Sequence, residues 1–333
     1  MEKVSIGGQA VLEGVMMKYK DKYAVAVRKP DKDIEVKIDK YTPGGDKHKI
    51  LKLPIIRGVN NFIESLIVGT KTLMYSSSFY EEDEEEIRKH EEKEAKKKAK
   101  KSSNEKTNEE DLENKNKKSD DLEVIGTIAL SIVLAVGIFM LLPAFITGLL
   151  EKHIESNIFL GIIEGVVRLA IFLLYIWLIS KMEDIHRVYM YHGAEHKTIN
   201  CFEKGLDLTV ENVMKQSRFH KRCGTSFLFI VMCVSILVFM CIKTRVMWLR
   251  LVLRVLFVPV IAGISYEFIR FAGRSDSKIA DLLSKPGLWI QRLTTKEPTP
   301  DMVEVAIKSV EAVFDWKAYL DEMRSKSSGD DKK

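Results

Sequence analysis

Long apolar runs dominate the second half of the chain. Residues 124–150 contain no charged side chain, and a helix needs about 20 apolar residues to cross a hydrocarbon core of roughly 30 Å. Further apolar stretches follow at 158–180, 226–242 and 246–272. The pattern predicts an α-helical multi-pass membrane protein with about four transmembrane helices, in a membrane domain that covers residues 122–272.

The flanking segments follow other patterns. Residues 1–50 alternate apolar and polar positions and are rich in β-branched residues, which predicts a β-rich N-terminal segment. Apolar residues recur at helical spacing in 51–80, which predicts an amphipathic helix on the membrane surface or against the spans. Residues 81–121 mix acids and bases and predict a solvated linker or a fraying charged helix. Residues 273–333 predict a helical C-terminal segment, with one helix over 300–323.

The distribution of lysine and arginine predicts the orientation. The connection over residues 182–225 is rich in basic residues, which collect on cytoplasmic loops. We therefore expect this loop and both termini on the cytoplasmic side, where they would form a small α+β region. Lys243, Arg245 and Arg250 in the opposite turn count weakly against this orientation.

Composition narrows the classes further. The net charge of +5 is the balance of many residues of both signs. The sequence has no basic stripe interleaved with aromatic residues, so we do not expect nucleic-acid binding. The four cysteines show no paired spacing, so we expect reduced thiols on the cytoplasmic side. No basic stretch followed by an apolar core opens the chain, so no cleavable signal peptide is expected.

The stretch YHGAEHKTINCFE, residues 191–203, carries the first chemical motif. His192 and His196 are four residues apart, so a helix would place both imidazoles on one face. Glu195 completes the order H-x-x-E-H, in which two histidines bind zinc and the glutamate activates water. The alternative is a polar helix face that only hydrogen bonds its neighbours.

A second motif, HKRCGTSF at residues 220–227, precedes the third apolar stretch. The return of the chain to the membrane would bring His220 and Cys223 back beside His192 and His196. Three imidazoles and one thiolate suit tetrahedral zinc or a related divalent ion. The sequence therefore predicts a metal site at these four residues, with Glu195 as the catalytic base.

Several alternatives stay open at this centre. A closed site with four protein ligands would be a structural clamp, whereas a catalytic site keeps one position open. Cys223 is alternatively a nucleophile with His220 as its base. The third ligand of a catalytic version is open among His220, Cys223, Glu203, Glu211, Glu297 and Glu304.

Two other groups of residues are chemical candidates. The glycine-rich stretch GGQAVLEGVMM, residues 7–17, predicts a tight turn between strands or a binding loop over the metal site. Its candidate substrate-binding residues, together with one from the second motif, are Gln9, Glu13 and Arg222. Charged residues within or at the edge of the apolar runs are expected to form local pairs or cross-helix pairs, or else a polar path: Glu164, Arg168, Glu267 and Arg270.

Taken together, these motifs resemble the YqhQ family of bacterial inner-membrane proteins, a domain of unknown function. The resemblance covers nearly the whole chain outside residues 81–121. It implies a multi-pass protein of the bacterial cytoplasmic membrane and a metal-dependent enzyme, and it does not imply a substrate. The matching stretches are GGQAVLEGVMM, RKP at 28–30, PIIRG at 54–58, YHGAEHKTIN, HKRCGTSFL, YEFIR and PGLWIQRLTTKEP.

The resulting hypothesis is a zinc-dependent hydrolase at the cytoplasmic face of the membrane. Its partners would be the lipid bilayer and a membrane-protein or lipid-linked substrate. Nucleic acid is not an expected partner, and the prediction is compatible with a homo-oligomer. The alternatives are a membrane scaffold or assembly factor with a structural zinc clamp, and a small transporter that uses the charged residues of the spans.

Overall fold

The computed structural model describes residues 6–44, 48–99, 126, 130–131, 133–150, 152–154, 156–221, 223–242, 247–274 and 277–330. Within these ranges the chain is mostly helical with a small N-terminal β-sheet, as the sequence predicts. The elements are β1 (Ile6–Val11), β2 (Gly14–Tyr19), β3 (Lys22–Arg28), β4 (Ile34–Lys40), η1 (Lys49–Lys52), α2 (Ile56–Ala99), η2 (Gly137–Leu141), α4 (Leu142–Leu150), α5 (Asn157–Ile179), α6 (Glu183–Glu203), α7 (Val210–Met214), α8 (Gly224–Met240), α9 (Met247–Arg274), α10 (Lys278–Thr294), α11 (Pro300–Val313) and α12 (Trp316–Asp330).

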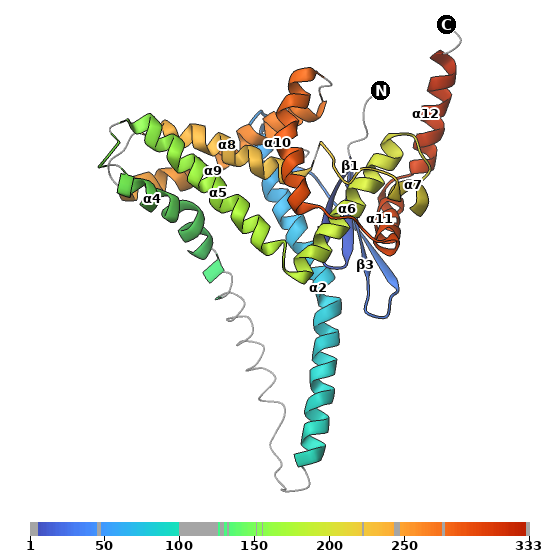
Figure 1. Ribbon diagram of the computed structural model, residues 1–333. Coiled ribbons are helices and arrows are strands. Elements are labelled where there is room, and N and C mark those ends of the chain that lie inside the picture. Colours follow the sequence, from blue (N-terminus) through green and yellow to red (C-terminus); the bar gives the residue numbers. More distant parts are fainter. Residues whose placement is uncertain are drawn as a thin grey trace.

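The four strands form an antiparallel sheet in the order β1-β2-β3-β4. Successive side chains of a strand point to opposite faces, and here both faces of the central strands are covered. Val15, Met17 and Ala26 join the core that includes α6 and α11. Met16 and Val25 join a second core with α2. The sheet is therefore a middle layer, with α6 and α11 on one side and α2 on the other (Figure 1).

The apolar helices lie together on the other side of α2 (Figure 1). Three are long and apolar enough to cross a membrane: Val133–Leu150, Ile158–Ile179 and Val252–Phe271. The third predicted stretch, 226–242, forms α8, which is apolar but shorter, with 17 residues. Among the described residues the structure thus has three candidate spans and one shorter apolar helix, where the sequence predicted about four spans.

Helix α2 joins the sheet to the apolar helices. Its first turns pack on α9, where Arg57 Nε donates to Glu267 Oε1 at 2.6 Å and Asn61 Nδ2 donates to the Tyr266 hydroxyl at 2.7 Å. Its later turns cover the sheet through Val68. The helix continues to Ala99, well past the end of the predicted amphipathic segment, because the charged residues that follow are mostly good helix formers.

The prediction of one C-terminal helix over residues 300–323 is wrong in one respect. The structure has two helices there, because the first ends at Val313. Phe314 is extended, with φ −139° and ψ 123°, and its ring packs against Tyr19 and Phe202. Aromatic pairs of this geometry contribute about 0.5–1.5 kcal/mol each beyond the area they bury, which favours the break at Phe314. Asp315 then accepts the backbone N–H of Ala318 and starts α12.

Candidate metal centre

Three side chains from two elements converge beside the sheet. His192 and His196 lie on one face of α6, and Cys223 is the N-cap of α8. One ligand atom from each of these residues lies within 4.8 Å of the others. The i, i+4 spacing therefore places the two imidazoles as predicted, and the start of the third apolar stretch brings the thiol to them.

Both histidines are held in one tautomer by backbone carbonyls. His192 Nδ1 lies 2.9 Å from the carbonyl oxygen of Thr294, and His196 Nδ1 lies 2.7 Å from that of Arg218. A carbonyl oxygen only accepts, so each Nδ1 carries the proton and each Nε2 keeps its lone pair. His192 Nε2 lies 3.2 Å from Cys223 Sγ. Carbonyl-oriented imidazoles of this kind are typical of metal ligands.

The thiol of Cys223 is placed to ionise. Burial opposes ionisation, but His196 and the hydrogen bonds from Thr225 outweigh it and lower the pKa of this thiol below its usual value. The backbone N–H of Thr225, in the first turn of α8, lies 3.4 Å from Cys223 Sγ. Burial lowers the pKa of His196, with a smaller contribution from His192. A cysteine sulfur next to two imidazole nitrogens is a donor set that suits a cation such as zinc.

The loop before α8 is fastened to α6 by two polar side chains. The buried Lys197 ammonium donates to the carbonyls of Met214 and Gln216, both at 2.9 Å. Asn200 donates to the carbonyls of Ser217 and Phe219. These bonds hold the loop against α6 and so fix the Arg218 carbonyl that orients His196.

His220 lies beside the centre but outside the group of three. Its ring centroid is 5.7 Å from that of His196, and its Nε2 lies 3.4 Å from Glu203 Oε2. Its backbone is held by Gln291 of α10, which accepts from its N–H at 2.9 Å and donates to its carbonyl at 2.8 Å. The structure thus brings together three of the four predicted ligands, His192, His196 and Cys223. Ligation by His220 stays a prediction.

The other candidate third ligands are engaged elsewhere. Glu211 pairs with Lys215 on the surface, Glu297 with Lys197, and Glu304 with Arg28. Each lies outside the group of three among the residues that the structure describes.

Glu195 is buried next to the three candidate ligands. It is 5% exposed, and its Oε2 has no hydrogen-bond partner in the described part of the chain. Burial raises the pKa of this carboxyl to about 8; the nearby Cys223 also raises it and His192 opposes the shift. An unpartnered buried carboxylate oxygen is costly, and such perturbed groups gather at functional sites.

The glycine-rich stretch forms the β1–β2 hairpin and covers this carboxylate. A Cβ atom at Gly8 would lie 2.7 Å from Glu195 Cδ, so the strand approaches Glu195 as closely as a glycine permits. Gln9 contacts Gly69 of α2, and Glu13, in the turn, is bound by both Arg187 and Tyr191 of α6. Two of the predicted substrate-binding residues therefore tie the hairpin to its neighbours, and the third, Arg222, lies outside the described residues.

Comparison with known proteins agrees with these motifs. Residues 53–316 match the family model described as "Protein of unknown function (DUF1385)". The chain belongs to this family. It is also 38% identical, over 97% of its own length and 96% of the relative's, to the "Uncharacterized protein YqhQ" of Bacillus subtilis strain 168. No solved structure matches the chain.

In this DUF1385 chain, the residues that sequence reasoning missed are those that orient the ligands. Thr294 and Arg218 act through backbone carbonyls, which no side-chain pattern reveals. Gln291 is fully buried in an otherwise amphipathic helix, and a polar residue on the apolar face of α10 was the available signal. Its amide connects the backbone of His220 to Ser226 of α8.

The contact between Gly8 and Glu195 predicts a steric effect. In Gly8→Ala the new methyl group would displace the buried carboxylate, and we expect a loss of about 1–3 kcal/mol in the free energy of unfolding. Gly7→Ala is the matched control, because nothing lies within 4 Å of a Cβ atom there. Chemical unfolding in detergent measures both. Adding Glu195→Ala should reduce the cost of Gly8→Ala, and equal costs in both backgrounds would contradict the contact.

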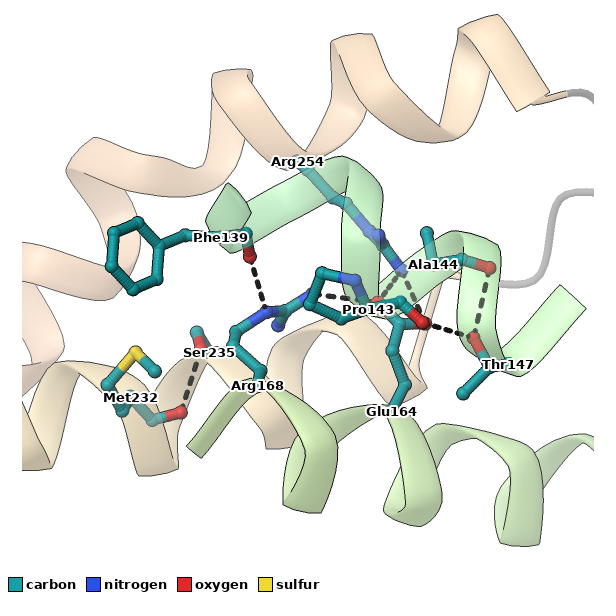
Figure 2. Close-up of polar contacts among 9 residues, drawn as sticks. All are labelled: Phe139, Pro143, Ala144, Thr147, Glu164, Arg168, Met232, Ser235 and Arg254. Carbon is teal, nitrogen blue, oxygen red and sulfur yellow. Dashed lines mark hydrogen bonds and ion pairs between the residues drawn. The ribbon is translucent and has the colours of Figure 1, made fainter. Parts of the chain in front are cut away.

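The charged residues of the apolar helices form two separate groups of ion pairs. In the first, Glu164 of α5 lies between Arg168 of the same helix and Arg254 of α9 (Figure 2), with N–O distances of 2.7 and 2.6 Å. Arg168 Nε also donates to the Phe139 carbonyl at 3.2 Å. The structure thus contains a local pair, Glu164 with Arg168, and cross-helix pairs, including Glu267 with Arg57 of α2.

Proposed function

We propose that this chain is a metal-dependent hydrolase that acts at the cytoplasmic face of a bacterial inner membrane. The observation that carries the proposal is the convergence of two imidazoles and one thiol beside the buried carboxyl of Glu195, whose Oε2 has no hydrogen-bond partner in the described part of the chain. The apolar helices that flank the centre are consistent with a membrane protein. The substrate would be a peptide, a lipid-linked group or a phosphoester.

The donor set favours zinc. Imidazole and thiolate ligands suit zinc better than magnesium or calcium, which prefer oxygen donors. His192, His196 and Cys223 would hold the ion. Catalytic zinc sites use three protein ligands and keep a fourth position open. When bound, the ion would supply Lewis-acid chemistry that lowers the pKa of a water from about 15.7 to about 7.

Glu195 is the general base in this proposal. Its carboxyl would accept a proton from the attacking water and pass it to the leaving group. A nearby dication favours the ionised form of a carboxyl, so metal loading would bring Glu195 into the state that accepts a proton. The β1–β2 hairpin keeps the carboxylate in place, because only a glycine leaves room for it at position 8.

Replacing Glu195 by glutamine tests this role. We expect Glu195→Gln to keep the fold and the zinc content while kcat falls about 10²–10⁴-fold, the usual contribution of a general base. The measurements are the metal content of the purified protein and the zinc-dependent hydrolysis of three probes: a fluorogenic peptide, bis-p-nitrophenyl phosphate and a fluorescent phospholipid.

Glu211→Gln is the matched control, because Glu211 is an exposed acid that pairs with Lys215 of the next turn. It should hydrolyse the probes as the wild type does. Unchanged turnover in Glu195→Gln would remove Glu195 as the base. A wild type that carries zinc but cleaves none of the probes would favour the second candidate function.

That second candidate is a scaffold with a structural zinc clamp. The observation in its favour is the position of His220, which is buried and whose ring lies near that of His196. A fourth protein ligand would close the site and tie α6 to the start of α8. His220→Ala would then lose zinc together with the ligand variants, whereas a three-ligand catalytic site would keep its zinc.

A further inference from the structure

A groove outside the metal centre runs along the outer face of α10. It has a volume of about 500 Å³ and is lined by Phe219, Lys285, Pro286, Leu288, Trp289 and Arg292. Among the side chains that the structure describes, its walls are mostly apolar, with two cations and no acidic residue. An anion attached to hydrocarbon matches such a lining, because the cations take the charge and the apolar wall takes the chain.

The exposed face of α10 has the composition of a membrane-interface helix. Leu282, Lys285, Trp289 and Arg292 follow one another at spacings of three and four residues and so share one face. Leu282 is 62% exposed and Trp289 54% exposed. Large apolar side chains interleaved with lysine and arginine are typical of helices that lie in the headgroup region of a bilayer.

The packing of α10 places the groove level with one end of the apolar helices. The helix begins four residues after the end of α9, and its buried face packs along α8. Gly287 lets the two helices approach, since a Cβ atom there would lie 2.5 Å from Ser226 Oγ. Gln291 also donates to Ser226 Oγ. The groove therefore lies beside the first turn of α8, where the apolar stretch begins.

We propose that this groove binds the headgroup of an anionic phospholipid from the surrounding bilayer. Lys285 and Arg292 would bind the phosphate, and Trp289 would lie among the upper acyl carbons. The proposal goes beyond the hydrolase and does not depend on metal binding. It places the lipid one helix away from the centre, because the other face of α10 carries the Thr294 carbonyl that orients His192.

Tryptophan fluorescence of the full-length protein in nanodiscs tests the site. Discs of zwitterionic phosphatidylcholine receive a minor fraction of brominated phosphatidylglycerol or brominated phosphatidylcholine, and bromine quenches nearby indoles. Trp289→Phe isolates the contribution of this one tryptophan among four. We expect brominated phosphatidylglycerol to quench Trp289 more strongly, and equal quenching by the two lipids would overturn the proposal.

Charge variants distinguish specific binding from general attraction. Lys285→Gln with Arg292→Gln should weaken the preference for phosphatidylglycerol about 5- to 30-fold. Lys317→Gln with Arg324→Gln on α12 removes the same charge next to another tryptophan, Trp316, and should leave the preference unchanged. Equal effects of the two double variants would overturn the proposal.

Soluble glycerol phosphate distinguishes the two sources of a phosphate group. Added to discs that contain brominated phosphatidylglycerol, it should leave the quenching of Trp289 unchanged. Relief of quenching at concentrations that do not alter the discs would assign the groove to a soluble phosphate compound and overturn the lipid. All six groove residues lie on the surface or in part on it, and thermal unfolding verifies that each variant is folded.

Discussion

Purified His196→Ala should contain almost no zinc, whereas the wild type should contain about one ion per chain. His196 is 1% exposed, and its Nδ1 lies against the Arg218 carbonyl, so its Nε2 is the ring nitrogen available to a metal ion beside Cys223. Removing one of three ligands should weaken zinc binding by at least about 100-fold, more than the loss of an outer hydrogen bond. Elemental analysis and competition with a chromogenic chelator measure the content and the affinity.

A stability measurement accompanies this prediction. A ligand that binds only the folded state stabilises it by about 2.7 kcal/mol when its concentration is about 100 times Kd. EDTA should therefore lower the Tm of the wild type and leave that of His196→Ala unchanged. His186→Ala, an exposed position on the same helix, is the control and should behave as the wild type. Equal zinc in wild type and His196→Ala would refute both the hydrolase and the clamp.

The second large effect is expected at Glu164. This carboxylate neutralises one of two guanidiniums whose side chains are each 5% exposed (Figure 2). Glu164→Gln leaves both arginines buried without an anion, and breaking a buried pair in this way costs about 3–5 kcal/mol. We expect a corresponding loss in the free energy of unfolding in detergent micelles.

A double variant tests the cause of this loss. Glu164→Gln with Arg254→Gln removes one charge of each sign and should be more stable than Glu164→Gln alone, because one unpaired cation is gone. A double variant that is less stable than the single one would show that the ion pair is not the source of the effect. A transporter that uses these charges would in addition lose function in Glu164→Gln at equal protein level.

Patterns that depend on near neighbours were predictable from the sequence. Helical periodicity places His192 and His196 on one face of α6 because residues four apart meet after one turn. The apolar alternation of the first forty residues predicts the strands, since side chains of a strand alternate between two faces. The H-x-x-E-H order also singled out Glu195 as the candidate base, a role that stays a prediction. These inferences need only the local geometry of the backbone.

Contacts between distant segments were not predictable in the same way. In the sequence, the basic residue nearest to Glu267 by helical spacing is Arg270, one turn away. In the structure, Glu267 instead forms its ion pair with Arg57, 210 positions earlier in the chain. From the sequence alone, His220 and Cys223 are equally good candidates to join the two histidines of α6 as ligands. Only the tertiary structure distinguishes them, because Gln291 holds the backbone of His220 while the start of α8 turns the thiol toward α6.

The sequence by itself determined the apolar helices, the sheet and the set of residues able to bind a metal, because each depends on residue types at short spacings. The tertiary structure alone decided which of those residues meet, which carbonyls orient them, and that Gly8 leaves room for Glu195. The physical reason is that the candidate metal centre joins α6, α8, α10 and β1 through contacts a few ångströms long, and their relative positions follow from the packing of the whole core.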